Sequence, residues 1–493
     1  MHYLPLDLFN QAYRSRLRPG RCEAASAPEA PVLAEHFGLQ FSRQPLKQAL
    51  ITLKPVHLRR WGLLALAPVV FLMASRPASA AAAHADPVAQ AEACPATETE
   101  LSLLPPAPNE ALLKESWEAY RQRFIQADGR VIDREASDRT TSEGQAYAMW
   151  RAVVINDRDT FDRVYRWAEN NLARHDDSGP VSVSVSGQPQ GSLWAWHWGR
   201  HESGQWQILD PNFAVDADID AAMALILASR RWRCPAYLEA ARSRLADIWE
   251  YSTVVLPDGT RQLLPGPVDA FWNQPDRMIL NPSYFSPYAY RLFAQVDRER
   301  DWLALIDSGY AMLEASSALS PVGLPSDWIA YNPAADAYSL LPTDSSVQSR
   351  YSFDAFRVWW RVGLDLAWYG EPRARAYLTS NLGYLTQRWQ RDRKLPAVIS
   401  LSGEDLADYE ATAQYAMLYP ALRQTSPLLA LQIYRQKLAP AYRNGFWDND
   451  SAYYTQNLAW FALLPKTPPG LVFQSALPAL RHLSATIHAY PLP

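Results

Sequence analysis

The chain has 493 residues, of which 48% are hydrophobic and 20% are charged, and its formal net charge is −4. This composition is typical of a folded globular protein and excludes a disordered chain. The mild, unclustered negative charge argues against nucleic acid and anionic membranes as partners. The 19 Trp and 25 Tyr residues indicate either a large aromatic core or flat surfaces for ligands with apolar faces, such as sugars.

The beginning of the chain is expected to direct export. Two arginines, an apolar stretch and then small residues predict a signal peptide over residues 56–80. The apolar stretch, at about 14 residues, is short for a membrane span, although an uncleaved signal would anchor the protein in a membrane. Residues 1–55 form an N-terminal extension or reflect a start codon assigned too early. We therefore expect the remainder to be periplasmic or secreted.

Two segments rich in proline flank the main domain. Residues 81–110 are rich in Ala and Pro and are expected to be a linker, and residues 466–493 form a Pro-rich tail. The cysteines Cys22, Cys94 and Cys234 are too few for a disulfide framework. The sequence leaves open whether Cys94 pairs with Cys234.

Between these segments, residues 111–465 carry no internal linker and are expected to form one domain. Apolar residues recur there at helical spacing and predict about eleven helices, at 111–125, 144–155, 159–173, 218–232, 235–252, 286–296, 302–316, 353–369, 411–422, 429–438 and 451–464. Alternation over 181–196 indicates a hairpin. Because no fixed-period repeat indicates a solenoid, a closed double ring of helices is the expected architecture.

Several of these helices begin with an acidic residue. Glu143 follows Ser142, which together with Gln145 has the pattern of a helix capping box. An acid in this position is stabilised by the helix dipole by about 0.3–1 kcal/mol, so Glu143 alone could be an ordinary helix-start residue. Asp216 and Asp218 begin a second helix in the same way.

Asp354 begins a third helix, with Arg357 one turn later. If the N-termini of these helices converge at one end of the ring, their acids converge as well. Glycosidic cleavage needs such a pair of carboxyl groups, one to protonate the leaving oxygen and one to activate water or attack. A helix N-terminus favours the ionised form, whereas a general acid must hold a proton. Asp216 is the candidate neighbour whose charge would keep a proton on Glu143.

Aromatic residues gather in "SLWAWHWGR", where Trp194, Trp196 and Trp198 alternate. On an extended segment they would share one face, where they either fill the core or stack on sugars.

We expect neither a metal nor a cofactor. His197 and His201 are four residues apart, but Gly199 disfavours a helix between them and no third ligand is evident. A Gly-x-Ser-x-Gly elbow, a P-loop and a dinucleotide fingerprint are also absent from the sequence.

Several long segments, in the right order between about 115 and 465, resemble glycoside hydrolase family 8. They include "DGRVIDREASDRTTSEGQAYAMW", "WAWHWGR", "ILDPNFAVDADIDAAM", "GLPSDWIAY", "YSFDAFRVWWRVGLD" and "YYTQNLAWF". The resemblance implies an all-α (α/α)6 barrel with a few short strands, and is closest to endoglucanases of bacterial cellulose synthesis. The family inverts anomeric configuration, which requires catalytic carboxyls roughly 6.5–9.5 Å apart.

Position by position, the resemblance implies that Glu143 is the general acid, Asp354 the general base and Asp216 the aspartate that binds the sugar at the cleavage point. It implies substrate contacts by Trp194, Trp196, Tyr284, Arg357 and Tyr454. The chain departs from the family pattern at Phe353, where a tyrosine commonly precedes the base, and at Val215, where Ser or Thr is usual.

The expected function is therefore an inverting endo-β-1,4-glucanase that acts on cellulose-like glucan, in functional association with cellulose synthase machinery and as a monomer. Chitosan, xylan and mixed-linkage glucan are alternative substrates. A glucan-binding protein of the cellulose-export machinery without catalytic activity is the alternative from another class. The presence of Glu143, Asp216 and Asp354 argues against it.

Overall fold

The computed structural model describes residue 94, residues 109–174 and residues 191–464. The expected N-terminal extension, signal peptide and C-terminal tail, nearly all of the expected linker and most of the 181–196 hairpin lie outside the described residues. Within the described ranges, no helix is both long and apolar enough to cross a bilayer.

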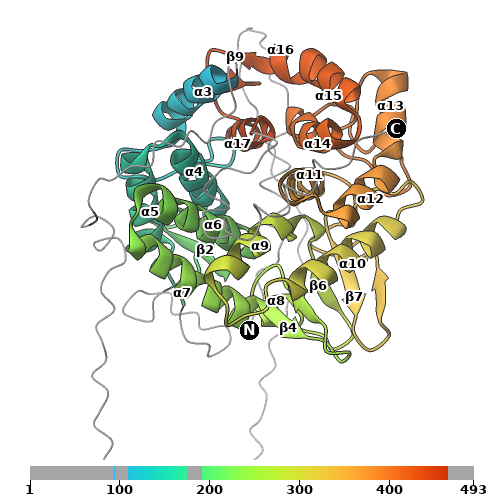
Figure 1. Cartoon of the computed structure of the whole chain (residues 1–493), viewed down its shortest axis with the longest axis horizontal. Helices are drawn as coiled ribbons and strands as arrows, with labels where there is room; N and C mark the ends of the chain where they lie inside the picture. The colour runs from blue at the N-terminus through green and yellow to red at the C-terminus, as the bar shows by residue number, and fades with distance from the viewer. Residues whose placement is uncertain (1–93, 95–108, 175–190, 465–493) are drawn as a thin grey trace, which may run out of the picture. The chain divides into compact units, whose positions relative to one another are not determined.

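The helices are arranged in two concentric rings (Figure 1). The inner ring consists of α4 (Ser142–Ile155), α6 (Val215–Trp232), α9 (Pro287–Val296), α11 (Phe356–Tyr369), α14 (Thr412–Thr425) and α17 (Tyr453–Ala462). The outer ring consists of α3 (Asn109–Phe124), α5 (Arg158–Asn171), α7 (Pro235–Ser252), α10 (Ala304–Ala318), α12 (Pro372–Asn381) and α15 (Pro427–Ile433). This alternation of outer and inner helices is an (α/α)6 barrel, as the sequence predicts.

Aromatic side chains close the inner ring. Phe461 of α17 lies 5.1 Å from Tyr147 and 4.7 Å from Trp150 of α4, between ring centroids. Where α11 meets α14, a Cβ on Gly363 would lie 3.1 Å from the Ala421 nitrogen, so glycine allows the close approach. Inner helices such as α4 and α6 are buried on almost every side, which explains their nearly continuous apolar sequences.

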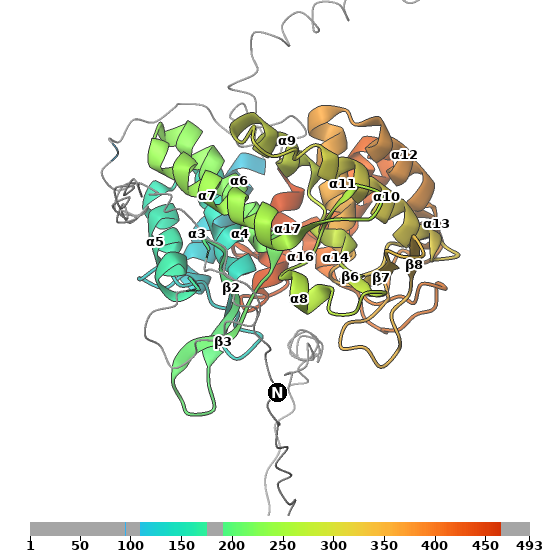
Figure 2. The ribbon, with the colours of Figure 1, turned by 90° about the horizontal axis from the view of Figure 1, so that it is seen from below.

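Short strands cover one end of the ring (Figure 2). One antiparallel sheet contains β1 (Thr140–Thr141), β2 (Ala195–Arg200) and β3 (Trp206–Phe213), and another contains β6 (Met278–Leu280), β7 (Ile329–Asn332) and β8 (Ala337–Ser339). Because β1 leads directly into α4 and β3 into α6, the sheet fixes where both helices begin. Two-stranded ribbons join β4 (Thr253–Val255) to β5 (Arg261–Leu263) and β9 (Tyr442–Arg443) to β10 (Phe446–Trp447).

Every helix expected from the sequence is present, and the structure adds others. The predicted helix at 429–438 is α15 followed by the π-helical turn η3 (Tyr434–Leu438). The helices not predicted are α12, α13 (Gly383–Asp392) and the short α8 (Val268–Phe271), η2 (Pro282–Tyr284) and α16 (Ala439–Ala441). Few residues of α12 and α13 are buried. The described strand of the expected hairpin, β2, pairs with β1 and β3.

A disulfide joins Cys94 to Cys234, across 140 residues of sequence. A cross-link over so long a loop restricts the unfolded chain, so we expect its removal to lower the free energy of unfolding by about 2–4 kcal/mol. Denaturant unfolding of the wild type and of the Cys94→Ala/Cys234→Ala variant, each with and without reductant, measures this. Reductant should destabilise only the wild type. Equal stability of variant and oxidised wild type would contradict the expectation.

Candidate active site

The acids that the sequence singled out meet around one guanidinium group. Nη1 of Arg357 donates to Oε2 of Glu143 at 2.7 Å and to Oδ2 of Asp216 at 2.9 Å. Nη2 donates to Oδ1 of Asp354 at 2.7 Å. The side chain of Arg357 is only 2% exposed, so these contacts replace its hydration, and such charge-assisted bonds are strong and directional.

The starts of three inner helices bring these four residues together. Glu143 is the second residue of α4, Asp216 is the second residue of α6, and Asp354 lies in the turn before α11, with Arg357 in its first turn. All of these helix ends face the end of the ring that carries the strands.

The expected cap of α4 was wrong by one residue. The N-cap is Thr141, whose hydroxyl accepts a hydrogen bond from the Gly144 nitrogen at 3.1 Å, while Ser142 is already helical. Gln145 does not reach back to the cap. Its side-chain oxygen instead accepts a hydrogen bond from the Val131 nitrogen at 2.6 Å, because the segment before β1 packs against the start of α4.

The carboxylates line a cavity with about 480 Å³ of empty space that is open to solvent. Its other walls combine aromatic rings with hydroxyl and guanidinium groups, the combination that binds sugars by stacking and hydrogen bonding. The lining residues besides the four above are Arg139, Thr141, Ser142, Trp196, Ala214, Tyr284 and Tyr453.

Asp354 is held at both of its oxygens. Trp328 donates its indole N–H to Oδ2 at 3.1 Å, opposite the Arg357 contact on Oδ1. Burial raises the pKa of Asp354 to about 6; Arg357 opposes this, and the charges of Asp327 and Asp216 add to it. A carboxylate with this raised pKa is a stronger base than an exposed aspartate and is still ionised at neutral pH.

Glu143 also has a donor at each oxygen. Tyr453 donates its hydroxyl to Oε1 at 3.0 Å, and that hydroxyl lies 3.2 Å from the capping hydroxyl of Thr141. The helix cap is therefore linked to the carboxyl group through one tyrosine. Asp216 shares Nη1 of Arg357 with Glu143 and so places a second carboxyl group beside it.

The two aspartates at the start of α6 have different surroundings. Asp216 accepts from the Ala217 nitrogen at 2.9 Å and from Arg357, and so belongs to the cavity. Asp218 is fully buried against Arg244, and burial raises its pKa to about 7. The Trp194 nitrogen donates to it at 3.3 Å. Asp218 is part of the core behind the site.

The alternating tryptophans do not share one face, contrary to expectation. The pairing of β2 with β3 shifts register on both sides of His197, and such bulges turn successive side chains out of alternation. Trp196 lines the cavity, whereas Trp198 stacks on Trp206 with ring centroids 5.1 Å apart. Trp194 has no exposed surface and donates to Glu169 at 2.9 Å. The expected sugar contact by Trp194 is therefore wrong.

Of the two tyrosines expected to contact sugar, only Tyr284 lines the cavity, with its ring centroid 5.3 Å from the Arg357 guanidinium carbon. Tyr454 is 3% exposed and donates to the carbonyl of Phe353 at 2.9 Å. It therefore holds the backbone next to Asp354 and does not line the cavity. Its neighbour Tyr453 takes the place at the cavity, one residue from the expected position.

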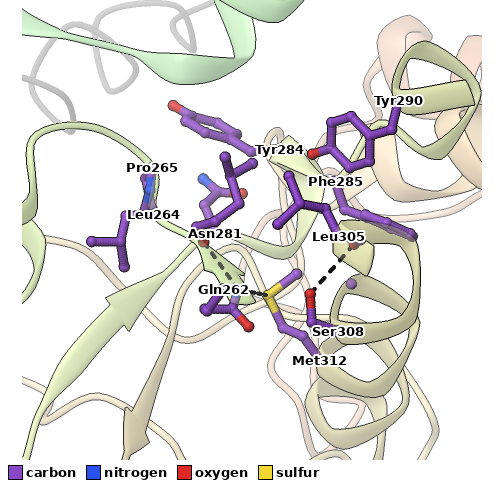
Figure 3. A pocket seen from close by; sticks show the side chains of 12 residues that line it. Gln262, Leu264, Pro265, Asn281, Tyr284, Phe285, Tyr290, Leu305, Ser308 and Met312 are labelled. Atoms are coloured by element: carbon purple, nitrogen blue, oxygen red, sulfur yellow. Dashed lines mark hydrogen bonds between the residues drawn. The ribbon is translucent and has the colours of Figure 1, made fainter. Parts of the chain in front are cut away.

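A second cavity, with about 300 Å³ of empty space, lies behind Tyr284 (Figure 3). Asn281 is in its wall and accepts from the hydroxyl of Ser283 at 2.7 Å. Ser283 in turn accepts from Nη2 of Arg357 at 3.1 Å. Asn281 and Ser283 therefore form a chain of hydrogen bonds that ends at Nη2 of Arg357.

The sequence interpretation missed Arg139, Thr141, Tyr453, Trp328 and Asp327. The segment "GLPSDWIAY", which contains Asp327 and Trp328, is one of the segments that resemble the family and could have indicated these two residues. His197 is buried, and its pKa is lowered to about 4 mainly by burial, so its ring is neutral at pH 7. Within the described ranges, no group of three or more His, Cys, Asp or Glu residues is arranged to hold a metal ion.

Comparison with known proteins places the chain in a family. Residues 99–467 match the model of glycosyl hydrolases family 8. An endoglucanase of Pseudomonas fluorescens is 30% identical over 379 residues, which is 70% of this chain and 91% of that protein. An endoglucanase of Xanthomonas axonopodis is 37% identical over 262 residues, 52% of this chain and 62% of that protein.

Solved structures of the family share the fold. The family 8 endoglucanase Cel10 of Klebsiella pneumoniae superimposes with a TM-score of 0.56 at 27% identity, covering 70% of this chain and 98% of that structure. Together with the match to the family model over most of the chain, this shows that the protein is a glycoside hydrolase and belongs to glycosyl hydrolases family 8.

Proposed function

We propose that the protein is an inverting endo-β-1,4-glucanase that hydrolyses cellulose-like glucan. The observation that carries the proposal is that Glu143 and Asp354 bond different nitrogens of Arg357 in one open, aromatic-walled cavity. Similarity to endoglucanases over most of the chain supports the same substrate class.

In the proposed reaction, Glu143 gives its proton to the glycosidic oxygen as the C1–O bond breaks. Asp354 takes a proton from a water that attacks C1 from the opposite face. Asp216 accepts hydrogen bonds from the sugar at the cleavage point. The nearest oxygens of the two catalytic carboxyls are at most about 8 Å apart, because both bond one guanidinium. That limit is compatible with the roughly 6.5–9.5 Å that leaves room for the water.

Activity is expected to fall as the pH drops through about 6. Asp354 must be ionised to act as base, and its raised pKa of about 6 means that it becomes protonated in this range. The acid limb of kcat/KM reports this group in the free enzyme, so kcat/KM should be halved near pH 6. A limb near pH 4, where an ordinary aspartate titrates, would contradict the assignment.

A panel of soluble polysaccharides tests the substrate. We expect reducing ends to be released fastest from carboxymethyl-cellulose, with chitosan, xylan and mixed-linkage glucan as the alternatives. Faster release from one of these would replace cellulose-like glucan as the proposed substrate but would leave the proposed hydrolytic mechanism unchanged. No release from any of them would favour a glucan-binding protein of the cellulose-export machinery.

We also propose that the protein is exported to the periplasm or the cell exterior, where it acts as a monomer alongside cellulose synthase machinery. The predicted signal at residues 56–80 supports export. N-terminal sequencing of the exported protein would locate the cleavage, or show an uncleaved anchor, and light scattering would give the mass in solution. A cytoplasmic location would contradict the first part, and a dimer the second.

A further inference from the structure

Asp327 lies directly behind the loop that carries Asp354. It is 4% exposed and occupies the segment just before β7. Its own nitrogen donates to the Arg350 carbonyl at 2.6 Å. The hydroxyl of the preceding Ser326 donates to the Trp328 carbonyl at 2.8 Å. The backbone of Asp327 is therefore fixed on both sides, which gives its carboxylate a defined position.

The side chain of Asp327 holds the base loop on both sides of Asp354. Its Oδ1 accepts from the nitrogens of Ser352 and Ala355, each at 2.9 Å, and its Oδ2 accepts from the Ser352 hydroxyl. These donors come before and after Asp354 in sequence. Trp328, next to Asp327, donates directly to Asp354, so two consecutive residues hold the base, one through the backbone and one through the side chain.

From this arrangement we propose that Asp327 is a positioning residue for the general base: it fixes the turn that presents Asp354 and places a second carboxylate behind it. The inference rests on the proposed function, because it takes Asp354 as the base. It gives Asp327 two separable effects, one on the geometry of Asp354 and one on its basicity.

The charged groups around Asp327 and Asp354 decide whether Asp327 raises or lowers the basicity of Asp354. Arg357 contacts Asp354 directly and favours its ionised form, while Asp216 and Glu143 on the same guanidinium oppose it. Tyr284 faces the cluster with a pKa raised well above its usual range by burial. Behind the loop, burial raises the pKa of Asp327, while Arg350, 3.6 Å from Oδ2, the Ser352 hydroxyl and the two backbone donors act in the opposite direction. An ionised Asp327 makes Asp354 harder to ionise and hence a stronger base.

The variant Asp327→Asn keeps an oxygen for the two backbone donors and removes the charge. We expect the acid limb of its kcat/KM profile to move to lower pH by about one unit. Its kcat at neutral pH should fall several-fold, since a weaker base accepts the proton less readily. Ser352→Ala keeps the charge but loses the hydroxyl contact, so kcat should fall without a shift of the limb. Asp157→Asn is a matched control, because Asp157 caps α5 through the Thr160 nitrogen at 3.0 Å, and it should leave both quantities unchanged.

A folded Asp327→Asn variant with the kcat and acid limb of the wild type would overturn the proposal, as would a Ser352→Ala variant that shifts the limb equally. If Asp327→Asn does not fold, an unchanged kcat in Ser352→Ala overturns the positioning role. A ¹³C-carboxyl titration of Asp354, assigned with Asp354→Asn, needs no substrate. A lower titration midpoint of Asp354 in Asp327→Asn would support the inference whether or not the wild type hydrolyses glucan. Absence of glucan hydrolysis by the wild type would reject only the proposed function.

Discussion

Replacing Glu143 with glutamine is expected to lower kcat/KM for cellulose hydrolysis by about 10²–10⁴-fold, the usual contribution of a general acid. Glutamine has nearly the same shape as glutamate and fits between Arg357 and Tyr453, but it cannot give a proton to the leaving oxygen. The deficit should nearly vanish with a dinitrophenyl cello-oligosaccharide, whose leaving group needs no protonation. Steady-state kinetics with both substrates measure the difference.

Tyr453→Phe is the matched control for this prediction. It removes the hydroxyl that bonds Glu143 and lies next to Thr141, yet it leaves the acid in place. Its loss of activity should be much smaller than that of Glu143→Gln and similar for both substrates. Unchanged hydrolysis of cellulose by Glu143→Gln would remove Glu143 from the role of acid.

Replacing Arg357 with methionine is expected to lower the free energy of unfolding strongly. Removing one partner of a buried ion pair typically costs about 3–5 kcal/mol, and here Glu143, Asp216 and Asp354 lose the same cation. Without the guanidinium, ionisation of these carboxyls is harder in the folded than in the unfolded chain, so their folded pKa values lie above the unfolded ones. The destabilisation should therefore be largest at neutral pH and shrink as the pH falls and the carboxyls take up protons.

Urea unfolding at pH 7 and pH 5 measures that pH dependence, and Arg357→Lys is its control. Lysine keeps the charge but cannot bond several oxygens with a planar fork, so it should restore part of the stability and little of the activity. A stable Arg357→Met variant at pH 7 would show that the carboxylate cluster does not depend on this cation.

The helices were predictable because apolar residues recur at helical spacing along most of them. The position of Glu143, Asp216 and Asp354 at helix starts was visible for the same reason. Their convergence was predicted only on the condition that these helix starts meet at one end of the ring, because it depends on how the ring closes; the family resemblance implied it as well. Aromatic content left open a large core or flat surfaces for sugars, and many of the rings lie in the core, where Trp150, Trp360 and Phe461 pack against one another.

The errors in the site arose where tertiary contacts override local pattern. A register shift between Ala195 and His197 separates Trp194, which lies in the core, from Trp196, which lines the cavity, although both belong to the same alternating stretch. The choice between Tyr453 and Tyr454 depends on the rotation of α17, which spacing alone does not define. Asp327 is far from Asp354 in sequence, and a buried aspartate that bonds backbone nitrogens has no sequence pattern of its own.

The configuration of the first product tests the central claim most directly. ¹H NMR during the first minutes of cellohexaose hydrolysis distinguishes the two anomers before they interconvert. If water activated by Asp354 attacks opposite the bond that Glu143 protonates, the new reducing end appears as the α-anomer. Initial release of the β-anomer would mean a covalent intermediate and a closer pair of carboxyls, and would contradict the account.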